Sequence, residues 1–125
     1  MQHDDGNKLL KYLTDAYLAA CDLMIFKDES LIQFSNWQTK WVVERGVLLI
    51  GEALKRSSVI EPNLKITDLH KIFATRNKIA HEYDEIEPSI LFIIIKRDFP
   101  ILIAELEMLL KSIDPDFDPK TISSA

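Results

Sequence analysis

Arg76, Asn77 and His81 are the residues whose types and spacing best suit a reaction at phosphorus. Arginine offers a planar fork of N–H donors that matches the oxygens of a phosphoryl group. Histidine titrates near neutral pH, so it can take up or release a proton during a reaction. Together they could cleave RNA without a metal ion. The 2′-OH would attack the neighbouring phosphorus, His81 would move a proton and Arg76 would stabilise the developing charge.

A helix that begins after Thr67 or Asp68 and frays near Tyr83 is predicted to carry these residues. Arg76 falls within the apolar stripe that would face the core, which consists of Leu69, Ile72, Phe73, Ile79 and Ala80. Because arginine is rarely buried alone, Arg76 should lean out of the core. Asn77 and His81 are i, i+4 neighbours at the rim of the stripe, with His81 about 140° from Arg76 around the axis.

A purely structural interpretation of the same residues stays open. Arg76 could pair with Glu44 or Glu52 of another helix. His81 could be an ordinary residue near a helix C-terminus, where a positive charge is favourable. The spacing of one arginine and one histidine does not decide between the two interpretations.

A metal site is not expected. His70 and His81 share one stripe of the helix, but about three turns separate them, too far to share one ion. Cys21 is the single cysteine, so it builds neither a disulfide framework nor a metal site by itself, and a small core residue is the expectation for it. The sequence therefore predicts no metal and no cofactor.

The composition favours one cytoplasmic helical domain spanning residues 1–125. A hydrophobic content of 47% in 125 residues allows a real core. The longest apolar run, residues 90–95, is too short to cross a membrane, and the start of the chain does not resemble a signal peptide. The net charge of −5 argues against broad wrapping of nucleic acid but leaves room for a local basic groove.

The apolar periodicity predicts an all-α fold, an antiparallel four-helix bundle with a kinked last helix. The first helix is expected after the caps in residues 5–7, and the second from Leu31 or Ser35 to Ser57. The fourth should begin at Pro88, bend at Pro100 and end near Ile113, giving an ordered core of about residues 8–113 before an irregular tail.

The second of these helices is apolar almost all round, which predicts a place at the centre of the bundle. Gly46 and Gly51 lie inside it, and two such costly residues indicate that another backbone approaches closely. Trp37 and Trp41 are i, i+4 neighbours. They suit the core or a dimer interface, with stacking on nucleic-acid bases as the other option.

Residues 76–83 resemble the Arg-Asn-x-x-x-His-x-Tyr signature of the HepT-like (DUF86) branch of the HEPN superfamily, since they read Arg76-Asn77-Lys78-Ile79-Ala80-His81-Glu82-Tyr83. Residues 41–56, with the step Gly51-Glu52-Ala53, are similar to the central helix of that branch. Asp98-Phe99-Pro100 resembles the Asp-Leu-Pro kink of its last helix. The likeness covers about residues 8–112.

The resemblance implies an RNA-cleaving toxin of a toxin–antitoxin system, acting as a homodimer whose two motifs share one cleft. Arg76 and His81 match the catalytic pair, Asn77 matches the polar residue beside them, and Glu52 is placed to orient Arg76. The implied partner is a minimal nucleotidyltransferase antitoxin, which silences the toxin by transferring AMP to the tyrosine matched by Tyr83.

The sequence departs from that branch directly after the motif. Asp84 and Glu85 follow Tyr83 where the branch often has an aromatic residue, and two acids beside the cleft would repel a phosphate backbone. The compensating basic residues, which are either RNA contacts or a solvated face, are Lys55, Arg56, Lys71 and Lys78. The acidic balance also favours an alternative function, a non-catalytic helical module that binds a nucleotidyltransferase or a second copy of itself.

Overall fold

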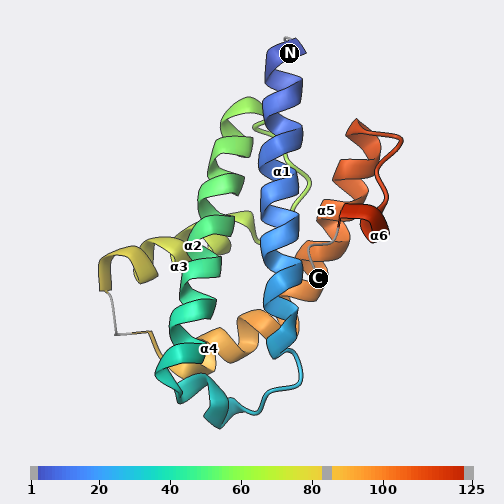
Figure 1. Cartoon of the computed structure of the whole chain (residues 1–125). Coiled ribbons are helices and arrows are strands. Elements are labelled where there is room, and N and C mark those ends of the chain that lie inside the picture. The colour runs from blue at the N-terminus through green and yellow to red at the C-terminus, as the bar shows by residue number, and fades with distance from the viewer. Residues whose placement is uncertain (1–2, 83–85, 123–125) are drawn as a thin grey trace.

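In the computed structural model the structure describes residues 3–82 and 86–122, and within these ranges the chain consists of helices joined by turns and short loops, with no strand. The two long helices, α1 (His3–Leu23) and α2 (Trp37–Ile60), lie side by side and antiparallel (Figure 1). Helix α3 (Leu69–Glu82) packs on α2, and α5 (Phe99–Ile113) packs on α1. The all-α prediction is confirmed.

The start of α1 differs from the expected one. The helix already begins at His3, so the residues expected to cap it lie inside it. Asp4 and Asp5 occupy the first turn, where negative charge interacts favourably with the exposed N–H groups. Asp4 also pairs with Lys8 one turn later at 3.2 Å. These local charges stabilise the early start.

Two short 3₁₀ turns connect α1 to α2, at Met24–Phe26 and Leu31–Ser35. The side-chain oxygen of Asn36 then accepts hydrogen bonds from the backbone N–H groups of Gln38 and Thr39, so α2 begins at Trp37, later than predicted. It also ends later, at Ile60, and the Ser57 hydroxyl donates to the Ala53 carbonyl within the helix.

The last long helix is bent as its prolines predict. Pro88 lies in the first turn of α4 (Pro88–Ile93), and a π-helical turn (Ile94–Asp98) joins α4 to α5 just before Pro100. Proline cannot donate a backbone hydrogen bond, so the wider turn accommodates it. Helices α4 and α5 consequently run in different directions (Figure 1).

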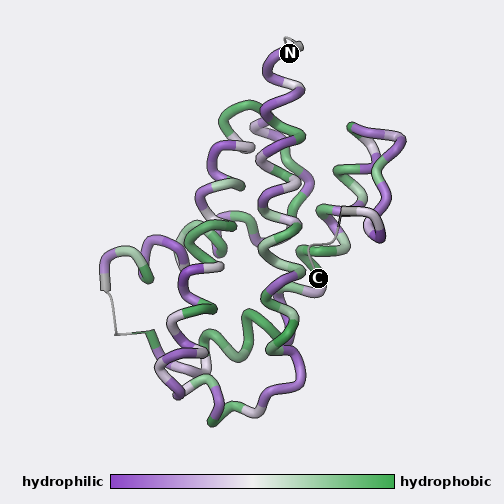
Figure 2. The backbone as a smooth tube through the Cα atoms, in the orientation of Figure 1, coloured by the Kyte–Doolittle hydropathy of each residue, from purple (hydrophilic) through white to green (hydrophobic). Residues whose placement is uncertain are grey.

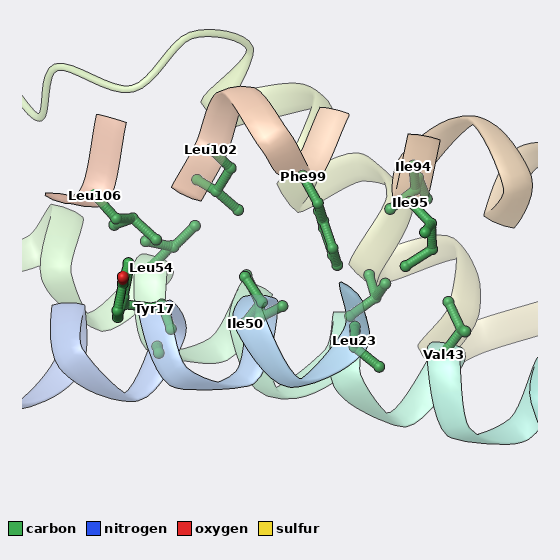
Figure 3. Packing of buried hydrophobic residues seen from close by; sticks show 14 of the residues in the cluster. Tyr17, Leu23, Val43, Ile50, Leu54, Ile94, Ile95, Phe99, Leu102 and Leu106 are labelled. Carbon is green, nitrogen blue, oxygen red and sulfur yellow. The ribbon is translucent and has the colours of Figure 1, made fainter. Parts of the chain in front are cut away.

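The core lies between the α1–α2 pair and the bent α4–α5 segment (Figure 3). Its buried side chains (Figure 3) include Tyr17, Leu23, Val43, Ile50, Leu54, Ile95, Phe99, Leu102 and Leu106. The chain is markedly hydrophobic over residues 90–95, from α4 into the π-helical turn, whereas α1 alternates in character as an amphipathic helix does (Figure 2). Within the described ranges no helix is both long and apolar enough to cross a membrane.

Helix α2 is not surrounded by protein, contrary to the expectation from its composition. One face is buried through Val43, Val47, Ile50 and Leu54. The opposite face leaves Trp37 71% exposed, Trp41 57% and Leu49 65%. Core positions for the two tryptophans are therefore excluded, and interface or base-stacking roles remain.

The C-terminal segment is more ordered than its composition suggested. Phe117 packs edge-on against Tyr17 of α1, with ring centroids 5.6 Å apart. A short helix, α6 (Pro119–Ile122), follows. The aromatic contact holds the segment against the bundle.

Candidate functional site

The site begins with a close approach between α2 and α3 at Gly51. A methyl group on Gly51 would lie 2.6 Å from Cγ and 2.7 Å from Cβ of Arg76, distances that real side chains essentially never show. A side chain, and not a backbone as expected from the sequence, therefore fills the space above this glycine. Because Gly51 has no Cβ, the stem of Arg76 can lie flat on α2 and direct its guanidinium group along the surface.

Glu52 holds that guanidinium group. Its Oε2 lies 3.1 Å from Nη2 of Arg76, and its Oε1 lies 3.2 Å from Nε of Arg56. On the other side, Nη1 of Arg76 donates to the amide oxygen of Asn77 at 3.1 Å. Each terminal nitrogen of arginine carries two hydrogens, so, among the residues that the structure describes, each retains one N–H for a ligand. Glu52 is one of the two partners of Arg76 that the sequence analysis considered.

The energetics of this arrangement do not favour stability. The Nε of Arg76 is buried and makes no hydrogen bond within the described part of the chain. An unsatisfied buried donor costs roughly 1–3 kcal/mol. A glycine inside a helix costs about 1 kcal/mol relative to alanine. The pair between the partly exposed Arg76 and Glu52 returns only about 0.2–1 kcal/mol. Such local costs are typical of functional sites.

His81 lies in the last turn of α3 and is exposed. Ile79, which is 6% exposed, anchors this turn on the core. Five residues of helix separate His81 from Arg76 by about 140° around the axis and about 7.5 Å along it. No hydrogen bond or ion pair joins the two side chains within the described residues. The structure thus places both at the surface of α3 without making them converge.

A small pocket of ≈ 60 Å³ surrounds the stem of Arg76, lined by Gly51, Lys55, Phe73, Arg76 and Asn77. Lys55 extends over the ring of Phe73, with its Nζ 5.0 Å from the centroid. Of the four basic residues considered as RNA contacts, Lys55 is the one beside Arg76.

The other three basic residues lie apart from the pocket or are already paired. Arg56 binds Glu52 and lies over the ring of Tyr12 at 5.8 Å. Lys71 pairs with Asp98 at 3.2 Å and so ties α3 to the bend before α5. Lys78 is exposed on α3 and does not line the pocket.

The expected AMP acceptor, Tyr83, lies outside the described residues, as do Asp84 and Glu85. Helix α3 is described to Glu82, which agrees with the predicted end. Within the described ranges, no three His, Cys, Asp or Glu side chains gather as a metal site would require.

Two residues near Arg76 were not recognised as part of a site from the sequence. Gly51 was expected to admit another backbone, and Phe73 was assigned only to the apolar stripe. The available signal was the pair Gly51-Glu52, which offers room and a negative charge on adjacent residues. The sequence did not reveal that Arg76 fills the space above Gly51, because the two residues are far apart in the chain.

The profile of the family described as ribonuclease HepT-like matches residues 15–109, well over half of the chain. That span includes Gly51, Glu52, Arg76 and His81. No curated protein and no solved structure was found to match.

Proposed function

Because the chain belongs to the HepT-like ribonuclease family, we propose that it is a metal-independent endoribonuclease toxin in which Arg76 and His81 are the catalytic residues. The observation that carries the proposal is the guanidinium group of Arg76. It is held at the surface by Glu52 and Asn77, at a cost in stability, and each terminal nitrogen retains an N–H. These donors suit two oxygens of one phosphate.

The proposed reaction is an internal transfer at phosphorus. The 2′-oxygen forms a bond to phosphorus and the bond to the 5′-oxygen breaks, which leaves a 2′,3′-cyclic phosphate and a free 5′-hydroxyl. His81 takes the proton from the 2′-OH, and the histidine of a second copy gives one to the leaving oxygen. Arg76 stabilises the negative charge that develops on the phosphoryl oxygens.

A homodimer is part of this proposal. Within one copy Arg76 and His81 point in different directions around α3. A second copy would bring further arginine and histidine side chains to one shared cleft. The exposed apolar side chains of α2, namely Trp37, Trp41 and Leu49, give a surface that such an interface could bury.

The control we propose is AMP transfer to Tyr83 by a minimal nucleotidyltransferase. The phenolic oxygen would attack the α-phosphorus of ATP and pyrophosphate would leave. The product carries a bulky anion two positions after His81 in the sequence. Negative charge there would compete with RNA for Arg76. Mass spectrometry of Tyr83 after co-expression with the partner tests this. An unmodified Tyr83 in the silenced toxin would rule the mechanism out.

The test of the catalytic proposal is cleavage of total RNA by the purified protein in the presence of a chelator. We expect cleavage by the wild type and its loss in Arg76→Ala and in His81→Ala. If the wild type does not cleave, or if both variants cleave as it does, the catalytic proposal is wrong.

A second candidate function is a non-catalytic module that binds a nucleotidyltransferase or another copy. The exposed tryptophans of α2 favour it, since large apolar side chains at a surface are typical of protein interfaces. Growth arrest on expression of the wild type, but not of His81→Ala, would argue against this candidate. Equal effects of both proteins would support it.

A further inference from the structure

The surroundings of Arg76 contain two residues that touch no substrate in the proposed mechanism and yet determine where its guanidinium group lies. We infer that Gly51 and Arg56 are positioning residues for Arg76, Gly51 by leaving room for its stem and Arg56 by orienting Glu52. This inference rests on the proposed function, because it names what holds the proposed catalytic arginine in place.

Gly51 acts on the part of Arg76 that cannot rotate away. The nearest atoms to a methyl group at position 51 are Cγ and Cβ of Arg76, at 2.6 and 2.7 Å. A Cβ atom moves only with its backbone, so a change of rotamer would not relieve the contact. Helix α3 would have to shift relative to α2, and the guanidinium group would shift with it.

Arg56 acts through the other oxygen of the same carboxylate. Its Nε lies 3.2 Å from Oε1 of Glu52, which leaves Oε2 for Arg76. Arg56 is itself placed against the ring of Tyr12 on α1, 5.8 Å from the centroid. A chain of contacts thus runs from Tyr12 through Arg56 and Glu52 to Arg76, and it joins three helices. This makes Arg56 a support of the arginine and not a contact for RNA.

The chain offers a matched control for Gly51. Gly46 lies on the same helix, is also buried, and a methyl group there would meet Cδ1 of Leu23 at 2.4 Å. The same substitution at Gly46 therefore also produces a steric conflict, in the core and away from Arg76, although the atom it meets first is the end of a leucine side chain, which can rotate. Both changes also give the helix the same gain in propensity.

The first experiment compares Gly51→Ala with Gly46→Ala in RNA cleavage, well below the melting temperature of each variant. We expect Gly51→Ala to lower kcat about 10- to 100-fold, the size of effect that a displacement of about 1 Å can have, and Gly46→Ala to leave kcat unchanged. Equal kcat values for Gly51→Ala and the wild type, or equal losses in both variants, would overturn the inference for Gly51.

The second experiment separates support from RNA binding at Arg56. If Arg56 acts through Glu52, Arg56→Gln lowers kcat with little change in KM, and it has no further effect in a Glu52→Gln background. If Arg56 contacts RNA, Arg56→Gln raises KM in both backgrounds. The KM of the variant then depends less steeply on salt concentration than that of the wild type. The latter result would overturn the inference for Arg56.

A third measurement keeps the inference testable if the protein cleaves no RNA, in which case the proposed function alone fails. The loss of melting temperature caused by Gly51→Ala is measured in the wild type and in Arg76→Gly, which lacks the atoms that the methyl group would meet. We expect a smaller loss in the Arg76→Gly background. The same loss in both backgrounds would show that Arg76 does not lie on Gly51.

Discussion

Two glycines of α2 admit a side chain from another helix, one in the core and one at the candidate site. Gly46 receives the branched end of Leu23, an apolar group that is 5% exposed. Gly51 receives the stem of Arg76, whose side chain remains 34% exposed and carries a charge to the surface. The same local device thus serves packing at one position and, one and a half turns later, the placement of a charged group.

The difference between the two positions lies in what the neighbouring atoms gain. Leu23 loses apolar contact with water and is packed on all sides, which stabilises the fold. Arg76 gains one partly exposed ion pair and loses a hydrogen bond at Nε. Substitutions at Leu23 and at Arg76 should therefore separate stability from activity.

The largest effect is expected at Arg76 and is on activity. Arg76→Ala should lower RNA cleavage by about 10²- to 10³-fold, since a preorganised donor to the developing charge is removed. The free energy of unfolding should change by no more than about 1 kcal/mol, because the pair with Glu52 is partly exposed. Cleavage assays and urea denaturation of the same preparation measure both quantities. A loss of several kcal/mol would mean that the side chain of Arg76 stabilises the core of the protein.

The next effect is expected at Leu23 and is on stability. Leu23→Ala should lower the free energy of unfolding by about 2–5 kcal/mol, because the side chain is buried and Gly46 cannot fill the cavity. Well below its melting temperature the variant should cleave RNA at the wild-type rate. Urea denaturation with a parallel cleavage assay measures the two effects. A fall in kcat comparable with that of Arg76→Ala would contradict the separation of the two regions.

A smaller effect is expected at Glu52. Glu52→Gln keeps the shape of the side chain but removes the charge that holds Arg76, so cleavage should fall less than in Arg76→Ala. The free energy of unfolding should change by about 1 kcal/mol or less, since both ion pairs of Glu52 are partly exposed. Steady-state kinetics beside thermal denaturation would show this. An inactive Glu52→Gln with intact Arg76 geometry would indicate a direct role of Glu52 in the reaction.

The smallest effect concerns a buried polar group on the packing side. The Tyr17 hydroxyl donates to Glu107 at 2.8 Å, and burial first, then this hydrogen bond, raise the pKa of Tyr17 above its usual value. In the unfolded chain the phenol ionises near pH ~10, while in the folded chain it stays protonated. The unfolded state then binds fewer protons, so this contribution to stability is complete below pH ~10 and is lost as the pH rises further.

Tyr17→Phe should lower the free energy of unfolding at neutral pH by about 0.5–1.5 kcal/mol through loss of the hydrogen bond. The decline in stability above pH ~10 should also be shallower than in the wild type, because one phenol no longer ionises on unfolding. Urea denaturation at neutral and alkaline pH measures both. An identical alkaline decline in the two proteins would show that Tyr17 ionises equally in the folded and unfolded states.

The elements that sequence analysis predicted well are those whose cause is local. Pro88 opens a helix and Pro100 bends one, because the proline ring acts on its own turn. The apolar periodicity of residues 69–80 places α3 and residues 76–82 correctly, and residues 90–95 are helical as predicted. The family resemblance, carried by contiguous residues, is confirmed by the match over residues 15–109.

Some of the predictions that were wrong have local causes, namely the charges that start α1 early and the asparagine cap that starts α2 late. The others depend on contacts between distant segments. Residues 31–35 were allowed as the start of the second helix, but they form a separate turn in which Phe34 is buried and packs edge-on against Phe92. The tryptophans of α2 are exposed because no other described helix covers that face. Phe117 is held by Tyr17, a residue far away in sequence. The local sequence around each of these residues does not show whether a distant segment covers it.

An all-α protein and the location of its candidate catalytic residues could be predicted from the amino-acid sequence, because helix periodicity and a contiguous motif are local properties. How Arg76 is held depends on the packing of two helices. Its stem lies on Gly51 and its charge faces Glu52, both on another helix and separated from it by 25 and 24 residues of sequence. The packing of α3 on α2 creates that contact, so it is a property of the folded chain.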